Sequence, residues 1–300
     1  MTTPLRAVAA VLAICAGLPV LAQTRCADHV PQARPQNASR DFVGADLDTI
    51  QERGWIEFAA YEDFPPWSWE EGGKARGVDV EIGRLIAEEL GVEARFTLVV
   101  AGENLDADLR NWVWKGPVVG GRVANVMLHV PYDSNFACRV EQVVFTGQYH
   151  EEQVAIAYRE AAYPDEKPVP AYFRFDTVAV ENDSIADFYL TSFPGGQLAG
   201  SIRRYPTMQA AMAGLTQGDT MAAMGPLAQL EHGVEAGVAV HTPPLPGFSV
   251  GKWTIGLAVH FSHRPLAYAV DDAIAAGLQD GRIAEIFNRY GLTFTPPALR

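Results

Sequence analysis

Residues 55–100, WIEFAAYEDFPPWSWEEGGKARGVDVEIGRLIAEELGVEARFTLVV, contain a strand, a loop, a helix and a second strand in that order. Residues 55–61 are a short apolar run, and residues 62–77 are rich in Pro, Gly and Trp, which is typical of a loop. Residues 78–90 carry apolar side chains at helical spacing and precede Gly91, a natural helix C-cap. Residues 94–100 are a further apolar strand. This order predicts an α/β fold with a parallel sheet and helices packed on it.

The same alternation returns in the second half of the chain. It predicts a strand at 175–183, helices at 184–193 and 207–218, a strand leading into a helix at 220–232, and a strand with two helices over 252–292. Proline-rich segments at 161–173 and 241–248 interrupt the pattern. Trp112 and Trp114 lie two positions apart, so on a strand they would share one face.

The N-terminus is typical of an exported protein. Arg6 precedes an apolar run at 7–21 that is short for a membrane span, which predicts a signal peptide over residues 1–22, cleaved after Ala22. Residues 23–41 then form an N-terminal arm. An uncleaved anchor is the alternative. We expect no membrane insertion elsewhere, because no later stretch is long and apolar enough.

Cysteine usage fits an oxidising compartment. Cys15 leaves with the signal peptide, and Cys26 and Cys138 remain. An even number of cysteines in an exported protein favours a Cys26–Cys138 disulfide as the simplest hypothesis. Two buried free thiols are the alternative.

Charge and motif content exclude several classes of function. Acidic residues outnumber basic ones 36 to 23, giving a net charge of −13, so we expect no nucleic-acid partner. The sequence has no haem-attachment, EF-hand or nucleotide-loop motif. His260 and His263 fall in a strand-to-loop stretch that does not suit a metal pair. We therefore expect no cofactor and no metal.

Three segments carry a resemblance to a known family. These are residues 64–92 with an aromatic-Pro-aromatic loop and a helix, 139–149 with an arginine followed by Phe-Thr-x-x-Tyr, and 256–291 with a strand and helices. Over residues 42–295 the chain resembles the periplasmic solute-binding proteins of family 3, the amino-acid-transport type. The resemblance implies a two-lobed type II fold with a central cleft that closes by hinge bending. Lobe 1 would comprise 42–150 and 254–300, lobe 2 would comprise 154–246, and the hinges would lie at 151–153 and 247–253.

The resemblance also implies a set of cleft residues. Arg139 matches the arginine that holds a ligand carboxylate in this family, a role that its planar guanidinium suits. Where the family has an acid for the ligand ammonium, this chain has Gly225 and Pro226, and Met221 replaces the aspartate of the preceding turn. The other expected cleft residues are Tyr61, Phe64, Trp67, His129, Tyr132, Asp133, Gln148, Tyr149, Asp183 and Ser184.

A narrower resemblance covers residues 108–158. Their Asn-Trp-x-Trp, His-Val-Pro-Tyr-Asp and Cys-Arg segments are similar to the quinoprotein-dehydrogenase-associated branch, the accessory proteins of bacterial methanol oxidation of the MxaJ and XoxJ kind. This implies a non-catalytic periplasmic partner of a PQQ-dependent alcohol dehydrogenase, acting in its maturation or activation, with the cytochrome c of that enzyme as a further partner. Trp67 and Tyr132 would then dock the partner, and their removal would leave the fold intact.

Two other functions stay open. A transport receptor would deliver a small organic solute to an ABC permease. A dehydratase acting on cyclic acids, an activity that some relatives have acquired, would need a carboxylic acid in the cleft. The candidates in the right loops are Glu62, Asp63 and Asp133.

Overall fold

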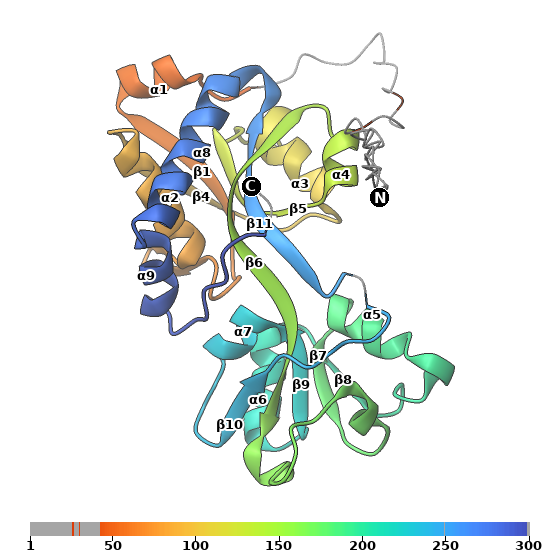
Figure 1. Ribbon diagram of the computed structural model, residues 1–300. Helices are drawn as coiled ribbons and strands as arrows, with labels where there is room; N and C mark the ends of the chain where they lie inside the picture. The colour runs from red at the N-terminus through yellow and green to blue at the C-terminus, as the bar shows by residue number, and fades with distance from the viewer. Residues whose placement is uncertain (1–25, 27–29, 31–42, 249, 299–300) are drawn as a thin grey trace, which may run out of the picture.

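The computed structural model describes residues 26, 30, 43–248 and 250–298. The predicted signal peptide and most of the predicted arm lie outside them. Within the described residues, no helix has the length and apolar character needed to cross a membrane. Two lobes lie one above the other, connected by long strands (Figure 1).

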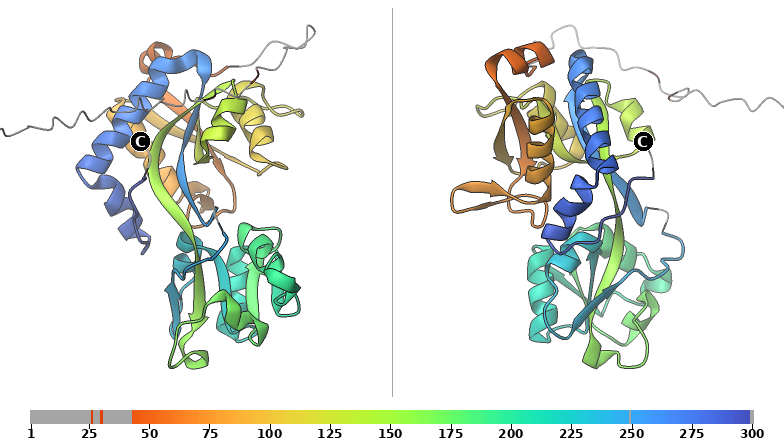
Figure 2. Two further views of the ribbon diagram at one scale, coloured as in Figure 1. Left: turned by 45° about the vertical axis from the view of Figure 1, so that its right-hand side comes forward. Right: turned by 60° about the vertical axis from the view of Figure 1, so that its left-hand side comes forward.

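Lobe 1 contains a sheet with helices on both faces (Figure 1, Figure 2). Its strands are ordered β4-β1-β5-β11-β6, with β1 parallel to β4 and β5, and with β11 antiparallel to β5 and β6. Its elements are α1 Leu47–Arg53, β1 Trp55–Tyr61, β2 Trp69–Glu71, β3 Lys74–Arg76, α2 Val78–Glu89, β4 Glu93–Val99, α3 Leu105–Leu109, the π-helix η1 Arg110–Trp114, β5 Val126–Tyr132, α4 Ser134–Arg139, β6 Val143–Arg159, β11 Lys252–His260, η5 Phe261–His263, α8 Arg264–Gln279 and α9 Arg282–Arg289.

The two faces of this sheet bury different sets of side chains, because alternate residues of a strand point to opposite faces. Phe58 belongs to the core cluster that includes Ile86 of α2 and Phe287 of α9, together with residues of α8. Ala59 packs on the other face with Leu109 and other residues of α3 and η1. Lobe 1 therefore has a core above and below its sheet.

Lobe 2 is built in the same way on a smaller sheet. Its strands run β6-β9-β7-β8, and β10 pairs with β6. Helix α5 packs on one face, and α6 and α7 pack on the other. Its elements are η2 Glu160–Ala162, η3 Pro170–Arg174, β7 Val178–Glu181, α5 Ile185–Thr191, η4 Pro194–Gly196, β8 Ile202–Tyr205, α6 Met208–Gln217, β9 Ala222–Pro226, α7 Leu227–His232 and β10 Val238–His241.

Strand β6 belongs to both sheets. It runs without a break through the hinge predicted at 151–153, and its residues 150–153 pair with 252–255 of β11. These two antiparallel strands form the connection between the lobes in Figure 1. A paired two-stranded ribbon can bend while it keeps its hydrogen bonds, so it suits a hinge.

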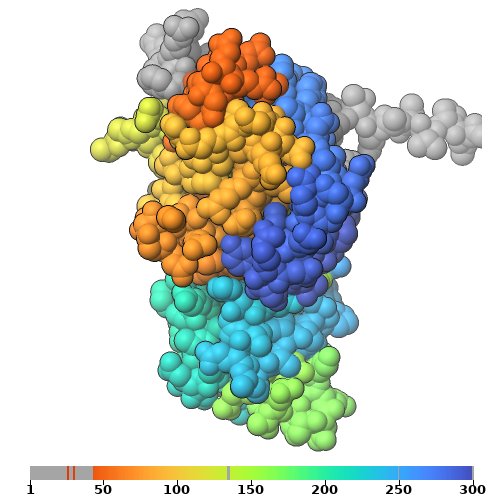
Figure 3. Space-filling view, turned by 90° about the vertical axis from the view of Figure 1, so that its left-hand side faces the viewer, coloured from red at the N-terminus to blue at the C-terminus, as the bar shows by residue number. Residues whose placement is uncertain are grey.

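The lobes also touch on one side, where β2, β3 and α9 lie directly against lobe 2 (Figure 3). The ring of Trp69 lies 5.9 Å from that of His232 at the end of α7. In the segment after α9, the backbone N–H and the hydroxyl of Thr293 donate to Glu231 at 2.8 and 2.6 Å. Helix α7 is therefore tied to lobe 1 by side-chain contacts.

Trp112 and Trp114 lie on a helix and not on a strand, so the shared face considered from their spacing does not arise. The side chain of Asn104 caps α3 by accepting from Ala107 N–H at 3.0 Å, and the helix continues as a π-helix through Trp114. A capped helix start outweighs the weak strand preference of two tryptophans.

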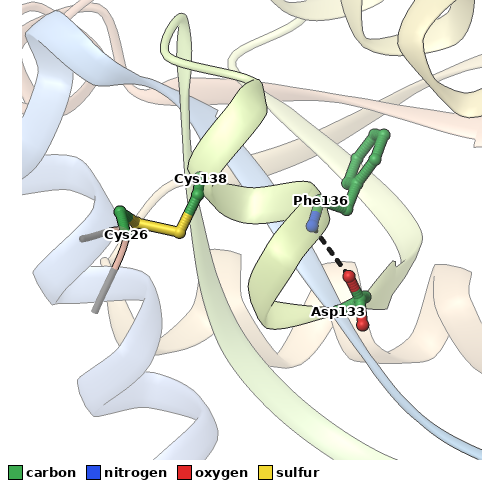
Figure 4. The surroundings of a disulfide bond; sticks show 4 residues. All are labelled: Cys26, Asp133, Phe136 and Cys138. Carbon is green, nitrogen blue, oxygen red and sulfur yellow. Dashed lines mark hydrogen bonds between the residues drawn. A yellow bond between two sulfur atoms is a disulfide. The ribbon is translucent and has the colours of Figure 1, made fainter. Parts of the chain in front are cut away.

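Cys26 and Cys138 form a disulfide, as predicted from the cysteine count. Cys138 lies on α4, whose first turn is capped by Asp133 accepting from the Phe136 N–H at 2.7 Å (Figure 4). The bond joins residues 112 positions apart. It thus fixes Cys26 against lobe 1.

Removal of this disulfide is expected to lower the free energy of unfolding by about 2–4 kcal/mol, because the bond restricts the unfolded chain. The measurement is urea unfolding of the Cys26→Ser/Cys138→Ser variant beside the oxidised wild type. The reduced wild type is the matched control and should behave like the variant. Equal stability of all three would show that the bond contributes nothing.

Candidate ligand-binding site

The ends of three parallel strands place loops at the edge of lobe 1 that faces lobe 2. Strands β1, β4 and β5 end at Tyr61, Val99 and Tyr132. Tyr132 pairs with Thr254, near the start of β11 and so beside the connection to lobe 2. In an open α/β sheet, loops beyond the carboxyl ends of strands line the ligand crevice. This edge is therefore the candidate site.

A buried carboxylate lies behind this edge. Asp79, in the first turn of α2, is fully buried and accepts a hydrogen bond from the Tyr149 hydroxyl at 2.5 Å. Its other oxygen lies 3.1 Å from Nδ1 of His129 and makes no hydrogen bond with it. The start of a helix favours a negative charge, which helps Asp79 to stay buried. Burial and the neighbouring Asp79 raise the pKa of Tyr149 well above its usual range.

Gly77 sets the position of this carboxylate. Its φ is +119°, and a Cβ there would lie 2.1 Å from the carbonyl oxygen of Trp67. The same carbonyl accepts from the Asp79 N–H at 2.9 Å. Only glycine permits this approach, so the loop after β1 is fixed to the start of α2.

His129 has a strained backbone, with φ of +56° in the middle of β5. Its ring packs edge-on to Phe64 at 5.0 Å and against Trp67 at 4.6 Å, and the residue is 7% exposed. Left-handed backbone at a non-glycine residue is uncommon and is concentrated at functional sites. Because Nδ1 lies 3.1 Å from the Asp79 carboxylate, Nε2 is the ring nitrogen through which this histidine could donate or accept a hydrogen bond with a ligand.

Tyr61 joins the ends of β1 and β4. Its hydroxyl donates to Asp108 at 2.8 Å, and the other oxygen of Asp108 accepts from the Gly102 N–H at 2.6 Å. Burial, followed by the charge of Asp108, raises the pKa of Tyr61. Tyr61 therefore stays neutral and hydrogen-bonded, and its partly exposed side chain lies at the edge of the site.

Arg139 lies at the end of α4 with its side chain 64% exposed. Its guanidinium is 4.0 Å from Asp106 and 5.3 Å from the ring centre of Phe136. A carboxylate of the chain itself thus occupies the neighbourhood in which a ligand carboxylate was predicted to bind. The role of Arg139 as a clamp remains a prediction.

Lobe 2 contributes the start of α5 and the end of β9. Ser184 caps α5 by accepting from the Asp187 N–H at 3.2 Å, and Asp183 is exposed. Gly225 is buried, and a Cβ there would lie 2.2 Å from the terminal methyl of Met208. The Met208 side chain therefore fills the space that an acid at position 225 would need.

No protein-family model and no curated protein matches the chain. Solved structures match it in fold. The ancestral cationic amino acid solute-binding protein AncCDT-1 has a TM-score of 0.67 at 17% identity, covering 82% of this chain and 99% of that chain. A second AncCDT-1 structure, described as a precursor of cyclohexadienyl dehydratase, has a TM-score of 0.59 at 18% identity, covering 82% and 100%. An amino acid ABC transporter substrate-binding protein from Streptococcus pneumoniae, bound to L-arginine, has a TM-score of 0.60 at 19% identity, covering 83% and 99%.

The chain has the type II periplasmic-binding-protein fold. This confirms the fold class predicted from the sequence. In this fold the candidate site lies between the lobes, so a ligand would contact lobe 1 at the strand ends and lobe 2 near α5 and β9.

Two predicted cleft residues do not reach this space. Trp67 is 1% exposed and packs against Phe287 and His150, and Tyr149 is fully buried. The prediction that Trp67 docks a partner was therefore wrong. Aromatic residues in a Pro-rich loop suggest exposure, but here the link through Gly77 turns the loop back onto the core. Tyr61, Phe64, Tyr132 and Gln148 keep partly exposed side chains, and Asp133 is exposed.

The hinge strand β6 of this chain contains a buried acid. Glu152 on β6 is 1% exposed and accepts from its neighbour Gln153 N–H at 2.8 Å and from Ala228 N–H, at the start of α7, at 3.4 Å. Burial raises its pKa to about 7. Two positions earlier, burial lowers the pKa of His150 to about 3. The hinge strand thus carries two buried groups with opposite pKa shifts.

Sequence reasoning missed Asp79, Asp108 and Glu152. Asp79 has a usable signal, because it lies three and four positions before Ile82 and Gly83 and so on the buried face of its helix. Glu152 has none, since a single acid in a strand is ordinarily exposed.

Proposed function

We propose that this protein is a non-catalytic periplasmic ligand-binding protein that closes its two lobes on a small organic solute other than a free amino acid, as the receptor of an ABC permease. The occupied space beside Gly225 is the observation that carries this proposal. Without an acid at position 225 or 226, a ligand ammonium would lack the partner that the resemblance places there, and an ammonium that is buried unpaired costs several kcal/mol. The half-exposed rings of Tyr61, Phe64 and Tyr132 suit a ligand with an apolar part.

Common α-amino acids are therefore expected to bind weakly or not at all. The loss of a few kcal/mol corresponds to at least a hundredfold in affinity. The measurement is titration calorimetry on protein that has been unfolded and refolded to remove bound ligand, with organic acids and alcohols as the comparison set. Micromolar binding of any common amino acid contradicts the proposal.

A second candidate is the accessory role toward a PQQ-dependent alcohol dehydrogenase. Residues 108–158, which carry that resemblance, form η1, β5 and α4 of lobe 1 and the strand β6 that continues into lobe 2. A partner surface would be built from the exposed residues of this segment, around the end of β5 and α4. The test is co-purification with the dehydrogenase and its cytochrome c. Tyr132→Ala should weaken the association at least tenfold, and Tyr268→Ala, an exposed tyrosine on α8, should not.

The dehydratase reading rests on Glu62, Asp63 and Asp133, all of which are exposed. Asp133 is also engaged as the cap of α4. Burial raises the pKa of a carboxylic acid toward neutral pH, where it can transfer protons. These three acids are exposed, so we rank catalysis below the two other candidate functions. Turnover of a cyclic hydroxy acid, followed by mass spectrometry, would reverse that order.

A further inference from the structure

Lobe 1 has a pocket at the end opposite to lobe 2. Its volume is about 510 Å³, and its walls include Arg53, Trp55, Glu57, Arg122 and Asn125. Trp55 begins β1 and Tyr61 ends it, so the strand rise separates the pocket from the candidate cleft by about 20 Å. The pocket is therefore a separate site, and its function does not rest on the function proposed for the cleft.

Partly buried hydrogen bonds hold the floor of the pocket in place. Asn125 accepts from Nη2 of Arg53 at 2.8 Å and from the Glu57 N–H at 3.0 Å, and it donates to the Ala45 carbonyl at 3.2 Å. Gly44 lies so close that a Cβ would be 2.8 Å from the Asn125 amide nitrogen. The floor is thus preorganised before any ligand binds.

Two guanidinium groups lie against the ring of Trp55, and one of them, that of Arg95, is also paired with Glu93 at 3.4 Å. The guanidinium of Arg53 lies 3.5 Å from the ring centre of Trp55, and that of Arg95 lies 4.4 Å from it. Nε of Arg53 donates to the Trp55 carbonyl at 2.9 Å, and Nη1 has no hydrogen bond with any residue that the structure describes. Burial lowers the pKa of Arg53, so a bound anion would restore favourable surroundings for its charge.

Arg122 adds a second cation to the wall. It is exposed and makes no ion pair or hydrogen bond within the described part of the chain. Glu57 is the acid among the lining residues, and its carboxylate accepts from the Thr97 hydroxyl at 2.7 Å. A cationic wall on a protein of net charge −13 attracts anions locally.

The rim of the pocket is apolar. Gly116 and Gly121 line the pocket, and the loop between them carries Val118 and Val119, which are 85% and 91% exposed. These two adjacent valines give the rim a small apolar surface. A ligand in the pocket with an apolar tail that extends past Val118 and Val119 would cover them.

We propose that this pocket binds a carboxylate that carries an apolar chain. The planar guanidinium of Arg53 and the free guanidinium of Arg122 pair with the carboxylate. The apolar chain lies along the Trp55 ring and the Val118–Val119 loop. Glu57 disfavours a more highly charged anion such as phosphate.

Titration calorimetry of the mature protein with octanoate, butyrate and inorganic phosphate tests this. Octanoate should bind saturably with one site, and more tightly than butyrate or phosphate. Arg122→Gln should weaken octanoate at least tenfold without loss of fold, because Arg122 is exposed and makes no hydrogen bond or ion pair within the described part of the chain. Arg203→Gln is the matched control, since this exposed lobe 2 arginine donates to the Gly200 carbonyl and should leave binding unchanged.

Three results would overturn the proposal. One is the absence of saturable octanoate binding to the wild type. Another is an equal loss of octanoate affinity in Arg122→Gln and Arg203→Gln, which would mean that the effect comes from the change in net charge and not from the pocket. The third is a loss in Tyr132→Ala with none in Arg122→Gln, which would place octanoate between the lobes.

Discussion

Replacement of Trp67 by alanine is expected to lower the free energy of unfolding by about 3–5 kcal/mol, the usual cost of removing a large buried aromatic side chain. Trp67 is 1% exposed and its ring packs against His129 at 4.6 Å and Phe287 at 5.9 Å. Its backbone also holds α2 through the Asp79 N–H. The cavity would open directly beside Asp79 and His129, so ligand binding in the cleft should weaken as well.

The measurement is urea unfolding followed by far-UV circular dichroism. Trp69→Ala is the matched control, because Trp69 lies two residues further on and is only half-buried. It should cost less, mainly through the lost contact with His232. If Trp67→Ala unfolds at the same urea concentration as the wild type, the Trp67 side chain is not buried as described. Trp67 would then again be a candidate for docking a partner.

Glu152 and His150, the two buried groups of the hinge, are expected to change the free energy of unfolding with pH in opposite directions. The pKa of Glu152 rises from 4.5 to about 7, so between these values the folded state keeps a proton that the unfolded state releases, and stability falls as pH rises. The pKa of His150 falls from 6.5 to about 3, so below pH 6.5 the unfolded state gains a proton that the folded state refuses, and stability falls as pH drops. From about pH 4.5 to 6.5 the two slopes oppose each other, each at up to about 1.4 kcal/mol per pH unit.

In the wild type the two pH dependences of stability largely cancel. A variant that lacks one of the two groups should therefore show the pH dependence that the other group causes. Relative to the wild type, Glu152→Gln should gain stability with rising pH over this window, and His150→Phe should lose it. The measurement is chemical unfolding at three pH values between 4.5 and 6.5. The double variant is the control and should regain the wild-type pH profile. Parallel profiles for all four proteins would mean that neither group is buried as described.

Local sequence features were enough for most secondary structure. The apolar spacing of residues 78–90 and Gly91 predicted α2, which ends at Glu89, and the apolar runs at 55–61 and 94–100 predicted β1 and β4. The order of these elements, with the resemblance they carry, also predicted the two-lobed fold. Hydrophobic periodicity and glycine or proline punctuation act over a few residues, so they can be read from the chain directly.

Candidate residues of the site were predicted less well. Tyr61 and Tyr132 end β1 and β5, and Phe64 follows in the loop after β1, because parallel strands bring their carboxyl ends to one edge; their role in a ligand site stays a prediction. Trp67 was misplaced, since its exposure depends on Phe287, which is 220 positions away in the chain. The filling of the space beside Gly225 by Met208 likewise depends on how α6 packs on β9.

The tertiary structure alone decided which polar groups are buried and what they contact. Asp79 meets Tyr149 from 70 positions away, Arg53 meets Asn125 from 72, and Glu152 meets Ala228 from 76. The sequence names each of these residues but assigns none of them a partner. A pKa, a pocket wall or a hinge contact arises only when packing removes water from two distant groups at once, and that depends on the whole fold rather than on any local pattern.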